Sequence, residues 1–182
     1  MLPDLATDVV TSTPMYEGTP LVDASAAHCS RRRFDTAQMR EGCVFCAVIA
    51  GDERGTIYRD EHVVAFLDHA PVFPGHTLVV PARHYDTLED LPEGEVAPLF
   101  LLSRRLSITF RTALGADGSF IAVNTRISQS VPHVHVHAVP RRKGDGLFSP
   151  GRGMWIRRRY AVGEAEQIAE QLRTALEGRG RV

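Results

Sequence analysis

The spacing of hydrophobic and polar residues predicts regular secondary structure from residue 43 onward. Short runs rich in β-branched and aromatic residues, separated by Asp, Pro and Gly, predict strands at 56–58, 62–67, 76–80, 119–124 and 133–139. Apolar stretches that end at glycine or fill one helical face predict helices at 43–50, about 91–114 and 163–177. Together these elements predict an α+β fold with about five mostly antiparallel strands and helices packed on the sheet.

Individual residues define the ends and faces of the helices. Gly51 and Gly115 each follow a helix and tolerate the left-handed conformation of a helix end. The first residue of the long helix is not determined by the pattern, because Pro92 and Pro98 lie near it and proline disrupts a helix interior. The apolar residues that recur along the long helix are Val96, Leu99, Phe100, Leu106, Phe110 and Ala113. The apolar face of the last helix consists of Ile168, Ala169, Leu172 and Leu176.

Composition separates residues 1–40 from the rest of the chain. They are rich in Thr, Ser, Ala, Pro and Asp and show no sustained period, so we expect an N-terminal extension outside the core. A flexible tail and a segment lying against the domain or a partner subunit are both consistent with this composition.

The charge balance excludes some classes of partner. The 182-residue chain has 21 Lys and Arg residues against 22 Asp and Glu residues, a formal net charge of −1, so we expect no nucleic-acid partner and no membrane association. No apolar run reaches the roughly 18 residues of a spanning helix. The first ten residues also lack a basic region before an apolar core, and we therefore expect a cytoplasmic protein.

Three histidines alternate with apolar residues at 133–139. Because successive strand side chains point to opposite faces, His133, His135 and His137 share one face of a strand. At about 3.3–3.4 Å per residue, the first and third backbones lie roughly 13 Å apart. Zinc–nitrogen bonds are only about 2.1 Å long, so one ion cannot easily hold all three rings. At least two functions are implied, although a simple metal site on His133 and His135 remains an alternative.

This stretch fits the His-x-His-x-His-x-x signature, with apolar x, of the histidine triad (HIT) superfamily of nucleotidyl hydrolases and transferases. Upstream motifs follow the order and approximate spacing of bacterial members; they are Cys43 to Cys46, Phe66 to Asp68, Pro74 to Pro81, Arg83 with His84, Asn124, and Ser128 to Val131. The resemblance covers residues 41–145 as a HIT domain core and leaves 146–182 as a C-terminal basic segment and helix. It implies a HIT-like fold, a homodimer and a small nucleotide substrate, with a purine base favoured.

The resemblance also implies the reaction. A histidine attacks the α-phosphate of a nucleotide, and water or another acceptor releases the nucleotidyl-histidine intermediate. By match to the motif His135 is the nucleophile, and a neutral imidazole oriented by a backbone carbonyl suits that role. His137 matches the histidine that stabilises charge on the phosphate. The other residues matched to the phosphate or the leaving group are His76, Asn124, Gln129 and Ser130.

Other matched residues are expected to hold the nucleoside. Asp68 matches an aspartate that accepts hydrogen bonds from the ribose hydroxyls, although an acidic residue before Pro71 is also a common turn former. Phe45, Ile49 and Phe66 are candidates for the wall of the base pocket, with core packing as the competing interpretation.

The cysteines point to a metal. Three cysteines, an odd number, do not make a disulfide framework, and Cys43 and Cys46 have the C-x-x-C spacing of metal or redox sites. With His84 and His133 they resemble the Cys-Cys-His-His zinc site of many bacterial members of the family, a closed structural site. His133 would then face zinc while His135 and His137 face the nucleotide. A redox role lacks a thioredoxin-like context, and Cys29 has no assigned role.

Two features depart from the commoner family pattern. Ser128 stands where glycine is frequent, and Pro132 stands where Tyr or Lys is usual, which affects the leaving-group contacts most. Residues 141–160 also carry seven basic residues against Asp145 alone. The seven are Arg141, Arg142, Lys143, Arg152, Arg157, Arg158 and Arg159. They form either a solvated basic face or a rim that attracts a polyphosphate or another anionic leaving group.

Three other functions fit the same residues. The chain could be a nucleotide-binding interaction module with vestigial catalysis, or a metallohydrolase with a catalytic metal on His133 and His135. A biosynthetic HIT-type enzyme that acts on a nucleotide-activated metabolite is a variant of the leading hypothesis.

Overall fold

The computed structural model describes residues 39–51, 55–149 and 155–178. The expectations for residues 1–38, including Cys29, and for Arg152 lie outside the described residues. The elements are α1 (Val44–Gly51), β1 (Thr56–Arg59), β2 (Val63–Leu67), β3 (Thr77–Pro81), the short 3-10 helix Leu88–Asp90, α2 (Glu93–Ala113), β4 (Gly118–Val123), β5 (Val136–Arg141) and α3 (Glu164–Glu177).

The five strands form one sheet in the order β1-β2-β3-β5-β4. Every neighbouring pair is antiparallel, so the predicted α+β fold with a five-stranded antiparallel sheet is confirmed. His137 pairs with Leu78 on one side and with Ala122 on the other, which places it at the middle of the β3-β5-β4 part of the sheet.

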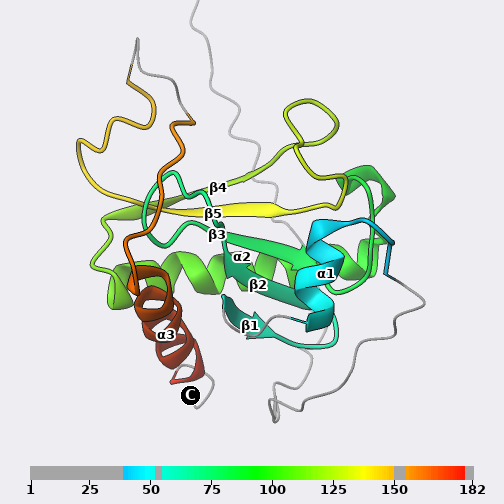
Figure 1. Ribbon diagram of the computed structural model, residues 1–182, viewed down its shortest axis with the longest axis horizontal. Coiled ribbons are helices and arrows are strands. Elements are labelled where there is room, and N and C mark those ends of the chain that lie inside the picture. The colour runs from blue at the N-terminus through cyan, green and yellow to red at the C-terminus, as the bar shows by residue number, and fades with distance from the viewer. Residues whose placement is uncertain (1–38, 52–54, 150–154, 179–182) are drawn as a thin grey trace, which may run out of the picture.

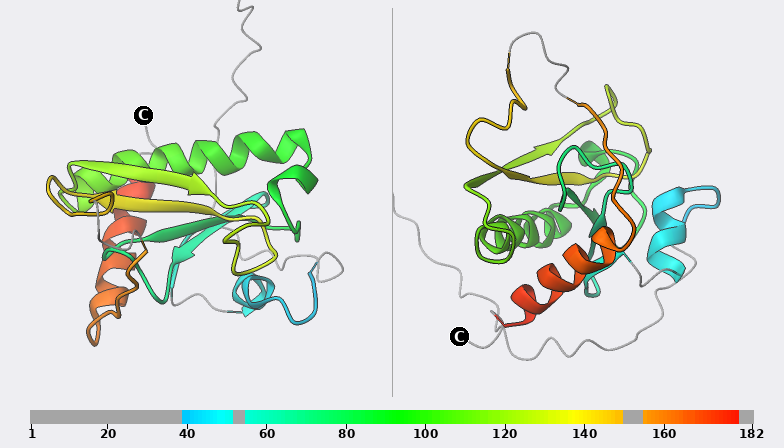
Figure 2. Two further views of the ribbon diagram at one scale, coloured as in Figure 1. Left: turned by 90° about the horizontal axis from the view of Figure 1, so that it is seen from above. Right: turned by 60° about the vertical axis from the view of Figure 1, so that its left-hand side comes forward.

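Helices cover the two faces of the sheet unequally (Figures 1 and 2). The long helix α2 and the C-terminal helix α3 lie on one face, where the main core includes Val134, Val136 and Ala138. The predicted apolar face of α3 is buried there, as expected: Ile168, Ala169, Leu172 and Leu176. The short helix α1 lies on the other face over a smaller apolar cluster that includes Ile49, Phe66 and Leu78. The alternation from Val134 to Ala138 therefore directs Val134, Val136 and Ala138 toward α2 and leaves the histidines between them on the α1 face.

The long helix differs from its prediction at two positions. It begins at Glu93, and Pro98 lies inside it, where the missing N–H removes one hydrogen bond to the carbonyl of the exposed Gly94. Phe100 is 39% exposed, whereas the buried stripe includes Leu99, Leu102, Leu106 and Phe110. The structure therefore places the buried face at spacings of three and four, which Phe100 does not share.

The histidine strand is shorter than predicted. β5 begins at Val136, so His133 and His135 precede the ladder. The reason lies in the partner strand, because β3 ends at Pro81, which has no N–H to donate. Instead, the N–H of Val134 donates to the carbonyl of Tyr85 at 2.8 Å.

None of the helices in the described part of the chain is long and apolar enough to cross a membrane.

Candidate active site and metal centre

Five histidines lie next to one another on the α1 face of the sheet. Ring centroids are 4.8 Å apart for His84 and His133, 4.8 Å for His135 and His137, and 5.2 Å for His137 and His76. The side chains of His76, His133, His135 and His137 are buried, with exposed fractions of 0–6%. The rings therefore form two neighbouring groups, one beside the cysteines and one beside Asp68.

The hydrogen bond of His135 defines its tautomer. Its Nδ1 lies 2.7 Å from the carbonyl oxygen of His133. A carbonyl can only accept, so Nδ1 carries the proton and Nε2 keeps its lone pair. Burial lowers the pKa of the ring, which keeps it neutral near pH 7. The carbonyl that the family resemblance called for is present, and Nε2 of His135 has the form a nucleophile needs.

A second chain of hydrogen bonds defines the tautomer of His137. The backbone N–H of Val72 donates to Nδ1 of His76 at 3.3 Å, and the other nitrogen of His76 lies 3.1 Å from Nδ1 of His137. An amide can only donate, so His76 carries its proton on Nε2 and passes that hydrogen bond to His137. His137 in turn holds its proton on Nε2. The pair thus leaves an N–H donor on His137, as stabilisation of a phosphate oxygen requires.

Burial also keeps this pair neutral. It lowers the pKa of His76 to about 4 and the pKa of His137 to about 3, whereas unfolded histidine has a pKa near 6.5. Between these values the unfolded chain binds protons that the folded chain does not, so the free energy of unfolding decreases as the pH falls below about 6.5. The charged and titratable groups around His137 are His76, His135, Asp68 and Arg157.

We expect His137→Asn to flatten this pH dependence. The variant lacks one group that binds a proton on unfolding. The slope of unfolding free energy against pH is therefore reduced by up to about 1.4 kcal/mol per pH unit between pH 6.5 and 4. Chemical denaturation of the wild type and the variant across that range measures both slopes. Parallel curves would contradict a neutral buried His137.

Asp68 lies beside this pair. Its Oδ1 accepts the N–H of Ala70 at 2.9 Å, and its Oδ2 is 3.5 Å from Nδ1 of His76. The side chain remains 15% exposed. The first contact is that of a turn former, whereas the exposed remainder leaves the carboxylate available to a diol, so both predicted roles fit one residue.

The second group is a candidate metal centre. Its four ligand atoms come from Cys43, Cys46, His84 and His133, and all lie within 4.8 Å of one another. Cys46 Sγ is 3.3 Å from His84 Nδ1 and 3.7 Å from His133 Nδ1, and Cys43 Sγ is 3.6 Å from the latter atom. A zinc tetrahedron with Zn–S near 2.3 Å and Zn–N near 2.1 Å has edges of about 3.4–3.8 Å. The cluster has the size and donor chemistry of a closed zinc site.

The outer nitrogens of the two metal-site histidines are held as such a site requires. Nε2 of His84 is 2.8 Å from Asp86 Oδ1, and Nε2 of His133 is 3.2 Å from the Pro81 carbonyl. Both partners accept, so each ring carries its proton on Nε2 and directs an unprotonated Nδ1 toward the thiols.

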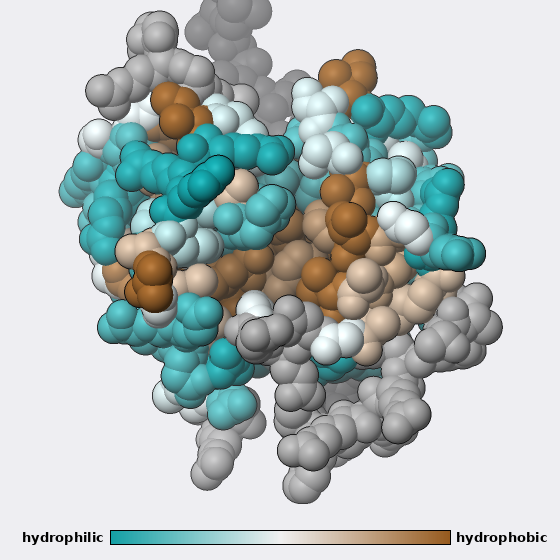
Figure 3. Space-filling view, viewed as in Figure 1, coloured by the Kyte–Doolittle hydropathy of each residue, from teal (hydrophilic) through white to brown (hydrophobic). Residues whose placement is uncertain are grey.

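The predicted base-pocket residues are buried in the structure. Phe45 contacts the rings of His133 and His135 edge-on, at centroid distances of 5.9 and 5.2 Å, and Phe66 at 5.4 Å. Ile49 is 0% exposed, which favours the packing interpretation for that residue. The face itself is hollowed between α1 and the hydrophilic surface over the C-terminal segment, and the hollow is floored by hydrophobic residues (Figure 3).

The side chain of Gln129 in the loop after β4 has its own hydrogen-bond partners. In the described chain, no hydrogen bond joins Asn124, Gln129 or Ser130 to His135 or His137. The Gln129 amide instead donates to the Asp86 carbonyl and accepts the N–H of Arg126.

The same loop explains one departure from the family pattern. Ser128 has a φ of 60°, the left-handed region that favours glycine, which accounts for the glycine usual at this position.

Trp155 is a residue that sequence reasoning missed. Its ring centroid is 5.0 Å from that of His137 and 5.8 Å from that of His76. The residue lies outside the recognised motifs and outside any periodic segment, and the one available signal was that it is the only tryptophan of the chain.

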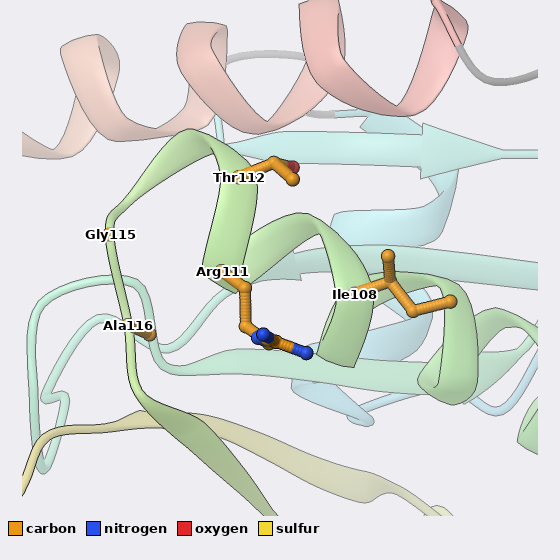
Figure 4. A pocket seen from close by; sticks show the side chains of 5 residues that line it. All are labelled: Ile108, Arg111, Thr112, Gly115 and Ala116. Atoms are coloured by element: carbon orange, nitrogen blue, oxygen red, sulfur yellow. The ribbon is translucent and has the colours of Figure 1, made fainter.

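A separate cavity of about 420 Å³ lies at the C-terminal end of α2. Its lining consists of Ile108, Arg111, Thr112, Gly115 and Ala116 (Figure 4). It contains none of the histidines, so the buried polar rings rather than this cavity mark the candidate chemistry.

Comparisons with known proteins point to one protein family. A family model described as HIT domain matches residues 52–144. An uncharacterized HIT-like protein from Methanocaldococcus jannaschii is 41% identical over 107 residues, which cover 57% of this chain and 82% of the relative. An adenylylsulfatase from Arabidopsis thaliana is 30% identical over 130 residues, 70% of this chain and 66% of the relative.

Two further similarities concern chemistry and metal. An asymmetrical bis(5'-nucleosyl)-tetraphosphatase from Schizosaccharomyces pombe is 38% identical over 90 residues, 48% of this chain and 50% of the relative. The crystal structure of a Zn-bound histidine triad family protein from Mycobacterium smegmatis superposes with a TM-score of 0.63 at 36% identity, covering 76% of this chain and 95% of that chain.

Proposed function

The chain belongs to the HIT family, and from that premise we propose that it is a nucleotidyl hydrolase or transferase acting at the α-phosphate of a nucleotide conjugate. The observation that carries the proposal is the buried, neutral His135, whose Nδ1–H is held by the His133 carbonyl beside the N–H donor of His137.

The proposed reaction has two displacements. Nε2 of His135 attacks the α-phosphorus, a P–N bond forms, and the bond from phosphorus to the leaving group breaks with its electron pair on the leaving group. Water or another acceptor then attacks the same phosphorus, a new P–O bond forms, and the ring of His135 is released. His137 donates from Nε2 to a non-bridging oxygen in both steps, while His76 holds the His137 ring in that tautomer.

The family relatives support a nucleotide conjugate as substrate. One relative is named as an adenylylsulfatase and another as a bis(5'-nucleosyl)-tetraphosphatase, and the substrates in both names join a nucleotide to an anionic leaving group. We assign the ribose to Asp68, the purine base to the hollow beside Phe45 and Phe66, and contacts to the phosphate or leaving group to Asn124, Gln129 and Ser130.

Zinc, held by Cys43, Cys46, His84 and His133, would be structural and would tie α1 to the segment just before β5. His133 is directed to the cysteines and His135 is not part of that cluster, which favours this role over a catalytic metal on both histidines. The proposed assembly is a cytoplasmic homodimer.

Trapping of the intermediate tests this function. The wild type is mixed with adenosine phosphoramidate, adenylyl sulfate or diadenosine tetraphosphate, quenched in base, and analysed by mass spectrometry. We expect an adenylyl adduct on the peptide that contains His135, with release of AMP. Nucleotide binding without an adduct or turnover on any of the three conjugates would instead identify an interaction module with vestigial catalysis.

A further inference from the structure

The chain crosses the histidine face again just before α3 (Figure 1). Three contacts fasten this crossing to the turn between β2 and β3, the turn that carries Asp68 and His76. The N–H of Arg158 donates to the Pro71 carbonyl at 2.8 Å, and the N–H of Gly75 donates to Tyr160 Oη at 3.4 Å. The Arg158 guanidinium lies over the Phe73 ring, 5.3 Å from its centroid. Residues 155–160 therefore have a defined place at the edge of the candidate phosphate site.

The contacts of Trp155 show how close that place is. Its ring meets those of His137 and His76 edge-on, with interplanar angles of 86° and 82°. It also lies near Phe120 of β4, at a centroid distance of 6.4 Å. The indole thus forms a wall beside the two histidines, two residues before Arg157 in the chain.

Three of the six basic residues of segment 141–160 that the structure describes have side-chain partners: Arg141, Arg142 and Arg158. Arg141 forms a double hydrogen bond with Asp145 at 2.5 and 2.7 Å. Arg142 donates to the carbonyls of Leu114 and Gly115 at the end of α2. Part of the basic excess seen in the sequence therefore holds loops and a helix end.

Arg157 is among the other three. It is exposed, and it makes no hydrogen bond or ion pair with any residue that the structure describes. Its charge nevertheless contributes to lowering the pKa values of both His76 and His137. Arg157 stands in the chain between Trp155, whose ring meets those of His137 and His76, and Arg158, whose N–H donates to the Pro71 carbonyl. An exposed guanidinium at this position, with its donors available, is suited to a phosphate group at the two histidines.

We propose that Arg157, held in place by Trp155, Arg158 and Tyr160, binds the phosphates of the leaving group and so makes the site selective for conjugates with a polyphosphate leaving group. This inference rests on the proposed function. When the bond from the α-phosphorus to the bridging oxygen breaks, the electron pair stays on that oxygen, and the departing nucleoside polyphosphate gains negative charge that a guanidinium stabilises. The amine of a phosphoramidate leaves after taking up a proton and brings no phosphate for Arg157 to bind.

The test compares two substrates in three proteins. kcat/KM is measured for diadenosine tetraphosphate and for adenosine phosphoramidate in the wild type, in Arg157→Gln and in Arg159→Gln. The control removes the same charge two residues away from another exposed position, so it reports the effect of net charge alone. We expect Arg157→Gln to lower kcat/KM for the tetraphosphate by about 10- to 100-fold, the range of one charge-assisted hydrogen-bonded contact, and to change the phosphoramidate value by less than about threefold.

Each result has one meaning. Equal losses on both substrates, or equal losses in Arg157→Gln and Arg159→Gln, would overturn the assignment of Arg157. Wild-type values for both substrates in Arg157→Gln would also overturn it, while leaving the nucleotidyl-transfer function intact. Absence of turnover and of the His135 adduct in the wild type would remove the proposed function itself.

Discussion

Replacement of His135 by alanine should abolish turnover of nucleotide conjugates, with kcat lower by at least about 10⁴-fold. The variant loses the only ring in the described site whose Nδ1–H is held by a backbone carbonyl and whose Nε2 lone pair is thereby presented to substrate. His137 cannot take over, because its Nδ1 accepts the hydrogen bond from His76 and its Nε2 carries a proton. Steady-state release of AMP and the adenylyl adduct by mass spectrometry measure the loss.

The control variant is His62→Ala. His62 is half exposed and contacts Glu95 of α2. The variant therefore also loses an imidazole, but one that lies outside the candidate site. Its turnover should equal that of the wild type. Zinc content is measured in both variants, because His135 follows the metal-site residue His133 by two positions. If His135→Ala kept a tenth or more of the wild-type kcat, the nucleophile would have to be another group.

The local pattern was sufficient to predict most of the fold. The apolar face of α3 and the alternation along β5 depend on neighbours within one element, and both are found in the structure. The predicted start of β5, residue 133, was wrong by three residues. The start depends on Pro81 in another strand, and a pattern read along one strand does not include that partner. The burial of Leu102 and exposure of Phe100 likewise depend on which side of α2 meets the sheet.

The candidate site was only partly predictable. The family resemblance predicted that Cys43 and His133 lie in one metal site, although they are 90 positions apart in the chain. A local pattern alone could not have predicted that contact. The role of Val72 was not predictable, since it acts through its backbone N–H, which every residue except proline has. Trp155 and Arg157 lie beyond the recognised motifs, and only the return of the chain across the sheet places them near His137. Gln129 is the opposite case: it was predicted from a matched motif, but its side chain donates to the Asp86 carbonyl and not to a histidine of the site.

Removal of the metal should destabilise the domain strongly, and α1 is the reason. An isolated helix shorter than about 12–15 residues is marginal in water, and α1 has 8. It supplies Cys43 just before its first residue and Cys46 within its first turn, so a bound zinc would join it to His84 and His133. Apart from those ligands it rests on the smaller apolar cluster through Phe45 and Ile49.

We therefore expect the purified protein to hold about one zinc per chain, and Cys46→Ser or exhaustive chelation to lower the free energy of unfolding by at least about 3 kcal/mol, or roughly 10 °C in Tm. The matched control is Cys29→Ser, which removes a thiol that is not one of the four candidate ligands and should retain both zinc and Tm. Metal analysis and thermal melts of the wild type, Cys46→Ser and Cys29→Ser measure the zinc content and the Tm. Equal zinc content and equal Tm in the two variants would show that the four-residue cluster is not the metal centre, and that α1 is held by its apolar contacts alone.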